Sequence, residues 1–290
     1  MKESSIRRIG SLLRALQLHR LIGAFLPRNN VRITYTHHVF AEDLGNFEAL
    51  IRYAASKRKV ITPKDFFDSY EGRSFQENSL LFTFDDGLLS SYHAAKKILS
   101  KYGIKAIFFV PTAILDFRTE DQMKEFAVNR VYFGRRKADS FRKEEYLTMS
   151  REQLIDLCKE GHMVFPHTHS HCRLKEIKDE TGIQEEIVRP KELLEDLLGC
   201  RIDAFAFPTG TERVVSSYAY SKIKELYRFC FTGLGGINAL DTDQHFLHRD
   251  CLHAHFNLKH AGNVLDGVYD IYYLYKMFLL KKAAGNRKNK

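Results

Sequence analysis

The chain contains 290 residues, 44% of them hydrophobic, so it can bury a sizeable core, and β/α barrels use about 200–250 residues as one domain. Its formal net charge is +9, but no recognisable nucleic-acid-binding module accompanies this charge, so we expect no nucleic-acid partner. The cysteines are odd in number and scattered singly, which excludes a disulfide framework or a zinc knuckle and fits a reducing compartment: Cys158, Cys172, Cys200, Cys230 and Cys251.

Residues 1–30 are predicted to form a basic amphipathic helix. Apolar residues recur at helical spacing from Ile6 to Leu26, with arginines among them. These charges leave residues 1–27 without a signal-peptide core or a membrane span, so we expect a cytoplasmic protein. Such a helix suits an anionic membrane surface, which would make the protein peripheral at the inner face of the membrane. It is equally typical of a helix that caps the bottom of a barrel.

The first strand is expected within residues 33–40. This stretch contains His37 and His38, which either line a site or serve a structural role.

From residue 31 to about residue 255 the chain alternates between strand and helix patterns, which predicts an α/β fold with a barrel of parallel strands. The apolar and β-branched run 80–84 predicts a buried strand. A helical pattern at 88–102 follows, and residues 104–110 predict the next strand.

Two carboxylates, Asp85 and Asp86, follow the strand at 80–84 directly, and Gly87 ends it. They therefore lie on the loop that opens a β-α-β unit. Catalytic groups of parallel α/β folds gather at this carboxyl edge. A paired Asp-Asp alone is weak evidence, because acidic pairs are common on solvated loops.

Three histidines within five residues strengthen the prediction of a site. His167, His169 and His171 follow a predicted short strand at 162–165. Neutral imidazole is a good ligand for zinc and similar ions, and one helical turn would bring His167 and His171 to the same side. The two aspartates and these two histidines can supply three metal ligands and a free base. His169 is expected to be a hydrogen-bonded loop residue.

The chain is predicted to divide into a helix at 1–30, a barrel at 31–260, and a C-terminal helix with a basic tail at 261–290. Within the barrel, residues 116–148 form a polar and aromatic insertion, which we expect to shape a groove over the catalytic edge. A helix is expected at 183–198, kinked or divided by Pro190.

Three motifs, in this order, resemble those of the polysaccharide deacetylases, the family of the NodB homology domain. They are Thr-Phe-Asp-Asp-Gly at 83–87, His-Thr-x-x-His-x-x-Leu at 167–174 and Phe-Ala-Phe-Pro-Thr-Gly at 205–210. The segment 94–111 is similar to the first β-α-β unit of that family, and the likeness covers roughly residues 31–255. The resemblance implies a distorted, incomplete (β/α) barrel and a hydrolase of non-peptide amide bonds.

The resemblance also implies roles for individual residues. Asp86, His167 and His171 would hold a divalent metal, with Zn²⁺ as the expected ion. Asp85 would be the base that takes a proton from the attacking water. Pro208 and Thr209 would bind the substrate, with the backbone N–H of Thr209 donating to the developing oxyanion.

The sequence departs from the family pattern at three points, one of which is Thr209, where the family usually has a tyrosine after the proline. Many members carry an arginine just before the third-motif proline, where this chain has Phe205-Ala206-Phe207, and we expect Arg249 to brace the catalytic aspartate instead. The general acid of the family is a late histidine. His248, His253 and His255 are candidates, although none fits the family pattern Leu-x-Leu-x-His.

The sequence thus predicts a metal-dependent hydrolase that removes an N-acetyl group from a sugar of a polysaccharide or a lipid-linked glycan precursor. A deformylase or another amide hydrolase on the same scaffold is an alternative. So is an amidohydrolase-type barrel that uses His167 and His169 as a His-x-His pair. A catalytically inactive carbohydrate-binding relative is the third alternative.

Overall fold

The computed structural model describes residues 29–72, 74–75, 77–211 and 215–285. The predicted N-terminal helix therefore lies outside the described residues except for its last two positions, as does the end of the basic tail. The strands are β1 (Val31–Thr36), β2 (Lys59–Val60), β3 (Ser79–Phe84), β4 (Ala106–Val110), β5 (Met163–Pro166), β6 (Ala204–Ala206), β7 (Phe229–Phe231), β8 (Ile237–Asn238) and β9 (Asp250–Cys251).

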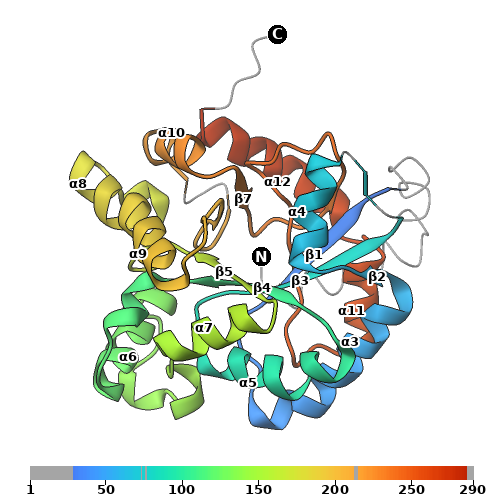
Figure 1. Cartoon of the computed structure of the whole chain (residues 1–290), viewed down its shortest axis with the longest axis horizontal. Helices are drawn as coiled ribbons and strands as arrows, with labels where there is room; N and C mark the ends of the chain where they lie inside the picture. The colour runs from blue at the N-terminus through green and yellow to red at the C-terminus, as the bar shows by residue number, and fades with distance from the viewer. Residues whose placement is uncertain (1–28, 73, 76, 212–214, 286–290) are drawn as a thin grey trace.

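Helices connect most of these strands and surround them (Figure 1). They are α3 (Leu44–Lys57), α4 (Pro63–Glu71), α5 (Leu89–Lys97), α6 (Glu120–Phe126), α7 (Arg151–Lys159), α8 (Glu180–Ile183), α9 (Arg189–Leu198), α10 (Ser217–Leu226), α11 (Leu258–Leu265) and α12 (Asp270–Ala283).

The strands form an open barrel. One sheet has the order β5-β4-β3-β1-β8, with β2 paired to β3 and β9 paired to β1, and every pairing in it except β1–β8 is parallel. A separate parallel pair, β6–β7, lies beside β5 without joining the larger sheet. The fold is therefore the distorted, incomplete (β/α) barrel that the sequence predicts.

Local sequence signals explain most element boundaries. The Ser150 side chain accepts a hydrogen bond from the backbone N–H of Gln153 in a reciprocal capping box that begins α7. The helix expected at 183–198 is instead α8, a π-helical turn at Gln184–Val188, and α9. Pro190 is the second residue of α9 and lies two positions after the π-helical turn ends, so the change in helix type falls beside the proline.

The first strand ends earlier than expected. It spans Val31–Thr36, and Thr36 pairs with Phe84, the last residue of β3. Because its partner strand stops there, β1 has nothing to pair with beyond Thr36. His37 and His38 consequently lie on the loop that follows the strand.

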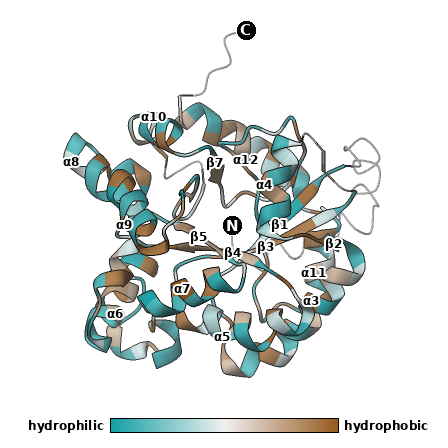
Figure 2. Ribbon diagram, in the orientation of Figure 1, coloured by the Kyte–Doolittle hydropathy of each residue, from teal (hydrophilic) through white to brown (hydrophobic). Residues whose placement is uncertain are grey.

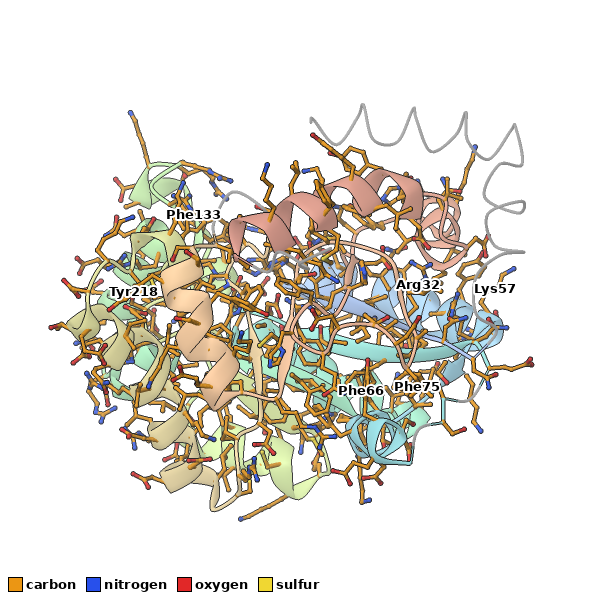
Figure 3. The ribbon with its side chains drawn as sticks, turned by 90° about the horizontal axis from the view of Figure 1, so that it is seen from above. Arg32, Lys57, Phe66, Phe75, Phe133 and Tyr218 are labelled. Carbon is orange, nitrogen blue, oxygen red and sulfur yellow. The ribbon has the colours of Figure 1, made fainter. Side chains whose placement is uncertain are left out.

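Aromatic side chains fill much of the interior. The hydrophobic residues concentrate on the central strands and the inward faces of the helices (Figure 2). Phe66 and Phe75, for example, are buried and stacked with their ring centroids 6.1 Å apart (Figure 3). Close packing of this kind keeps the strand ends in one arrangement.

A buried ion-pair cluster ties α12 to the sheet. Arg32 on β1 donates hydrogen bonds from Nη1 to Asp250 on β9, at 2.5 Å, and from Nη2 to Asp270 on α12, at 2.7 Å. All three residues are buried. Figure 3 shows Arg32 on its strand below the C-terminal helices.

Helix α12 presents an apolar face to solvent. Leu274, Tyr275 and Phe278 are 62%, 68% and 63% exposed, which is unusual for three large apolar side chains on one helix. Among the described residues, no helix combines the length and the hydrophobicity that crossing a bilayer requires.

We expect Arg32→Met to lower the free energy of unfolding by about 3–5 kcal/mol, because it leaves two buried carboxylates without their cation. Burial, opposed by Arg32, already raises the pKa of Asp250 to about 6. Without Arg32 the pKa of Asp250 rises further in the folded protein, whereas in the unfolded chain Asp250 ionises at its usual pKa. The loss in the free energy of unfolding should therefore be larger at pH 8, where the carboxylate must be buried in its charged form or bind a proton, than at pH 5. Urea denaturation at both pH values measures it. Arg52→Met, at an exposed position of α3, is the control, and equal losses in the two variants would contradict the prediction.

Candidate active site

The parallel register brings the site residues to one edge of the barrel. Phe84 of β3 pairs with Thr36 of β1 and with Phe108 of β4, and Val110 of β4 pairs with Pro166 of β5. The residues that directly follow β1, β3 and β5 are His37, Asp85 and His167. Segments separated by about 80 positions therefore meet, because the carboxyl ends of neighbouring parallel strands lie side by side.

Asp86, His167 and His171 converge in the interior of this edge. One carboxylate oxygen and one ring nitrogen from each histidine all lie within 4.8 Å of one another. Asp86 Oδ1 is 3.2 Å from His171 Nε2 and 3.8 Å from His167 Nε2. All three side chains are buried. His169 lies outside this cluster, with its Nδ1 2.9 Å from the Thr112 hydroxyl.

The hydrogen bonds around the cluster fit a bound cation. His167 Nδ1 lies 2.8 Å from the carbonyl oxygen of Ala206, and His171 Nδ1 lies 3.0 Å from that of Arg130. Donation to these carbonyls requires the proton on Nδ1, so each Nε2 presents a lone pair. Asp86 Oδ1 is buried and accepts no hydrogen bond from the described residues. Three electron-pair donors that face one another in a buried space fit a divalent metal ion.

The pKa of His167 agrees with this assignment, whereas the pKa of His171 reflects the buried carboxylate beside it. Burial lowers the pKa of His167 to about 4, which keeps the imidazole neutral, as a ligand must be. Burial alone would raise the pKa of Asp86, but the nearby His171 and His37 hold it well below its usual range. The Asp86 carboxylate in turn raises the pKa of His171, although burial opposes the shift.

Asp85 is held by a buried arginine. Arg249 donates from Nη1 to Asp85 Oδ1 at 2.7 Å and from Nη2 to Oδ2 at 2.9 Å, a bidentate pair in which both residues are buried. Arg249 also donates to the carbonyl of Thr232, and its guanidinium lies 5.0 Å from the ring centres of Tyr35 and Phe109. The contact expected between Arg249 and the first aspartate is therefore present.

Backbone strain is concentrated at the site. Six described residues other than glycine have positive φ, and five of them lie in or next to the site: Asp86, Phe133, Thr168, His171 and Thr209. Such conformations cost on the order of 1–3 kcal/mol each and persist where the surrounding fold imposes them. Gly87 also has positive φ (+66°), and a Cβ there would lie 2.6 Å from Ile114 Cδ1, so only glycine fits beside the two aspartates.

The metal-ligand cluster, Asp85 and Arg249 line a pocket of about 370 Å³, near the lower end of the range for small-molecule sites. Thr209 lines it, whereas Pro208 is buried and only adjoins it. His37 and His38 both line the pocket as well. Of the three late histidines, His253 alone does so.

The other two late histidines lie elsewhere. His248 Nδ1 is 3.0 Å from the carbonyl oxygen of Gly235, and the His255 ring stacks on that of His253, with centroids 5.2 Å apart. The choice between these histidines was open from sequence and depends on how the chain folds on both sides of β9.

The sequence did not identify which residues of the insertion line the pocket. The insertion 116–148 contributes Val131, Tyr132, Phe133 and Arg135 to the lining. The only sequence signal was the aromatic and charged composition of the insertion, which indicates a groove but does not identify its residues.

Comparison with known proteins identifies the family. The family model described as polysaccharide deacetylase matches residues 72–225, more than half of the chain. The chain therefore belongs to the polysaccharide deacetylase family, as its motifs predict. YxkH of Bacillus subtilis (strain 168), a polysaccharide deacetylase by name, is 24% identical over 195 residues. This match covers 66% of the chain but only 58% of YxkH, less than two thirds of that relative.

Solved structures support the fold. The deacetylase PplD of Streptococcus pyogenes, solved in complex with acetate, matches with a TM-score of 0.61 at 16% identity, over 81% of this chain and 96% of PplD. IcaB from Ammonifex degensii gives a TM-score of 0.62 at 20% identity, over 83% of this chain and 97% of IcaB. At these identities the likeness establishes the architecture.

We expect the purified protein to hold about one divalent ion per chain and His167→Ala to lose it, because the mutation removes one of three ligands. His169→Ala is the matched control and should retain the ion, since His169 is directed to Thr112. Elemental analysis after dialysis measures both. Loss of metal in His169→Ala with retention in His167→Ala would instead indicate a different ligand set.

Proposed function

We propose that this protein is a metal-dependent hydrolase that removes an N-acetyl group from a sugar of a polysaccharide or a lipid-linked glycan precursor. Membership of the polysaccharide deacetylase family supports the reaction class. The observation that carries the proposal is the buried convergence of Asp86, His167 and His171, with a second carboxylate, Asp85, directly beside it.

Asp86, His167 and His171 would hold the metal, with Zn²⁺ the expected ion for two imidazoles and one carboxylate. When bound, a divalent ion supplies Lewis-acid chemistry, lowering the pKa of water towards about 7 and polarising the amide carbonyl.

The protein's own residues would carry out the proton transfers and the positioning. Asp85 accepts a proton from the attacking water. Arg249 is a positioning residue that fixes both oxygens of Asp85 through its bidentate contact. The backbone N–H of Thr209, at the pocket wall, would donate to the oxygen on which negative charge develops.

His253 is the candidate for protonating the leaving amine. It lines the pocket, and its ring lies 5.7 Å from that of His37, another pocket residue. Burial, together with neighbouring His37, lowers the pKa of His253 to about 3. It would therefore be neutral at pH 7, and the proton that it passes to the leaving amine would be the one that Asp85 first accepts from the attacking water.

The same proposal assigns the enzyme to the cytoplasmic side of a membrane, in peripheral contact through residues 1–27. The basic amphipathic pattern of that segment supports the contact. So does the exposed apolar face of α12, which ends in the basic residues Lys281 and Lys282. Such contact would bring the pocket near lipid-linked sugars.

We expect Asp85→Asn to lower acetate release from N-acetylated glycans by at least about 100-fold while the metal content stays the same, because the variant lacks the base but keeps the ligands. Enzymatic assay of acetate, with formate assayed in parallel, measures activity and tests the deformylase alternative. Asp116→Asn, at a surface carboxylate paired with Arg151, is the control. Full activity in Asp85→Asn would remove Asp85 from the role of base.

We expect the full chain to float with liposomes that contain anionic lipids and to lose this binding when residues 1–27 are deleted. Leu274→Ser combined with Phe278→Ser should weaken flotation, because both side chains belong to the exposed face. The matched control is Leu240→Ser, an exposed apolar residue outside α12. Unchanged flotation after the deletion would favour the alternative that the segment covers the barrel.

A further inference from the structure

The insertion is joined to the metal-ligand cluster through its backbone and side chains. A π-helical turn at Ala127–Val131 follows α6, and the carbonyl of Arg130 in this turn accepts the hydrogen bond from His171 Nδ1. The hydroxyl of Tyr132 lies 2.6 Å from Nε2 of His38. Single-turn π bulges are frequent at functional sites. The segment 130–135 is therefore fixed relative to the cluster.

The next residues form a turn that brings a cation into the pocket. Phe133 has φ +54° and Gly134 has φ +64°, and the ring of Phe133 packs against that of His171 with centroids 5.7 Å apart. Figure 3 shows Phe133 on this segment. The Arg135 guanidinium lies 5.6 Å from the centre of the Phe133 ring, and Arg135 lines the pocket. One phenylalanine ring thus separates the guanidinium from a metal-ligating imidazole.

Among the residues that the structure describes, Arg135 has no acidic partner. Two carboxylates line the pocket, Asp85 and Asp86. Asp85 is paired with Arg249, and Asp86 faces the two histidines. Arg173, which lies 3.8 Å from the same Phe133 ring, has Glu176 at 3.5 Å, whereas no described carboxylate lies within ion-pair distance of Arg135.

We propose that Arg135 binds an anionic group carried by the substrate next to the acetamido sugar, so that the enzyme selects acidic glycans or glycosyl phosphates over neutral chains. A guanidinium recognises phosphate or carboxylate through paired, charge-assisted hydrogen bonds. Phe133 and the turn at Gly134 hold this group at a fixed place relative to the reacting amide. This inference rests on the proposed deacetylase function and adds the substrate class to it.

Two sources of the anion share this chemistry. One is a phosphate on the anomeric carbon, as in a lipid-linked sugar, and the other is the carboxylate of a neighbouring uronic acid. Acetate release should therefore be compared on three substrates: the methyl glycoside of N-acetylglucosamine, N-acetylglucosamine 1-phosphate, and a disaccharide of N-acetylglucosamine with glucuronic acid. The dependence on Arg135 identifies the source.

We expect Arg135→Gln to reduce the preference for the anionic over the neutral substrate, expressed as the ratio of kcat/KM values, by about 10- to 100-fold, as expected for lost charge-assisted hydrogen bonds. Lys137→Gln removes an equal charge from an exposed position of the same segment, outside the pocket lining, and should leave the ratio unchanged. A loss confined to the phosphate or to the uronic acid substrate supports the proposal and names the source. An unchanged ratio for both anionic substrates overturns it.

A binding measurement separates this inference from the proposed function. Calorimetric titration with glucosamine 1-phosphate, and separately with a disaccharide of glucosamine with glucuronic acid, requires no turnover, and both the wild type and Arg135→Gln keep the metal cluster. Weaker binding by Arg135→Gln supports the anion site, whether or not any substrate releases acetate. A failure of all substrates to release acetate would contradict only the deacetylase proposal. Equal affinities of the two proteins for both of these ligands overturn the anion site and leave the deacetylase proposal standing.

Discussion

The structure of the site depends on one electrostatic constraint: three buried electron-pair donors face one another. Two imidazoles are turned by backbone carbonyls so that their Nε2 atoms point to Asp86, which itself lacks a hydrogen-bond donor among the described residues. Buried donors of this kind repel one another unless a cation lies between them. The strained backbone at Asp86 and His171 indicates that the fold maintains this convergence at a cost.

Asp85, the carboxylate beside this cluster, has a partner of its own. Asp85 and Asp86 are adjacent in sequence, yet Arg249 contacts only Asp85, and the histidines contact Asp86. Neighbouring carboxylates can thus serve different purposes, because each one's environment, and not its type, determines what it binds. A second buried arginine, Arg32, has a structural role: it donates hydrogen bonds to Asp250 and Asp270 where α12 meets the sheet, and its positive charge offsets their negative charge.

The insertion contacts both the cluster and the pocket, through a few of its residues. The carbonyl of Arg130 accepts a hydrogen bond from His171, while side chains of the insertion line the pocket and place there the guanidinium of Arg135, which has no carboxylate partner among the described residues. Loops positioned by a rigid barrel commonly carry specificity in this way, because they can vary without disturbing the strands.

The sequence by itself determined the family, the barrel and the residues of the cluster, because the motifs are short, local and placed directly after strands whose apolar pattern is strong. It also predicted the contact of Arg249 with an aspartate through the missing arginine at 205–207. Only the tertiary structure decided which late histidine reaches the pocket, where β1 ends and which residues of the insertion line the site. These features depend on contacts between segments far apart in the chain, which local patterns do not encode.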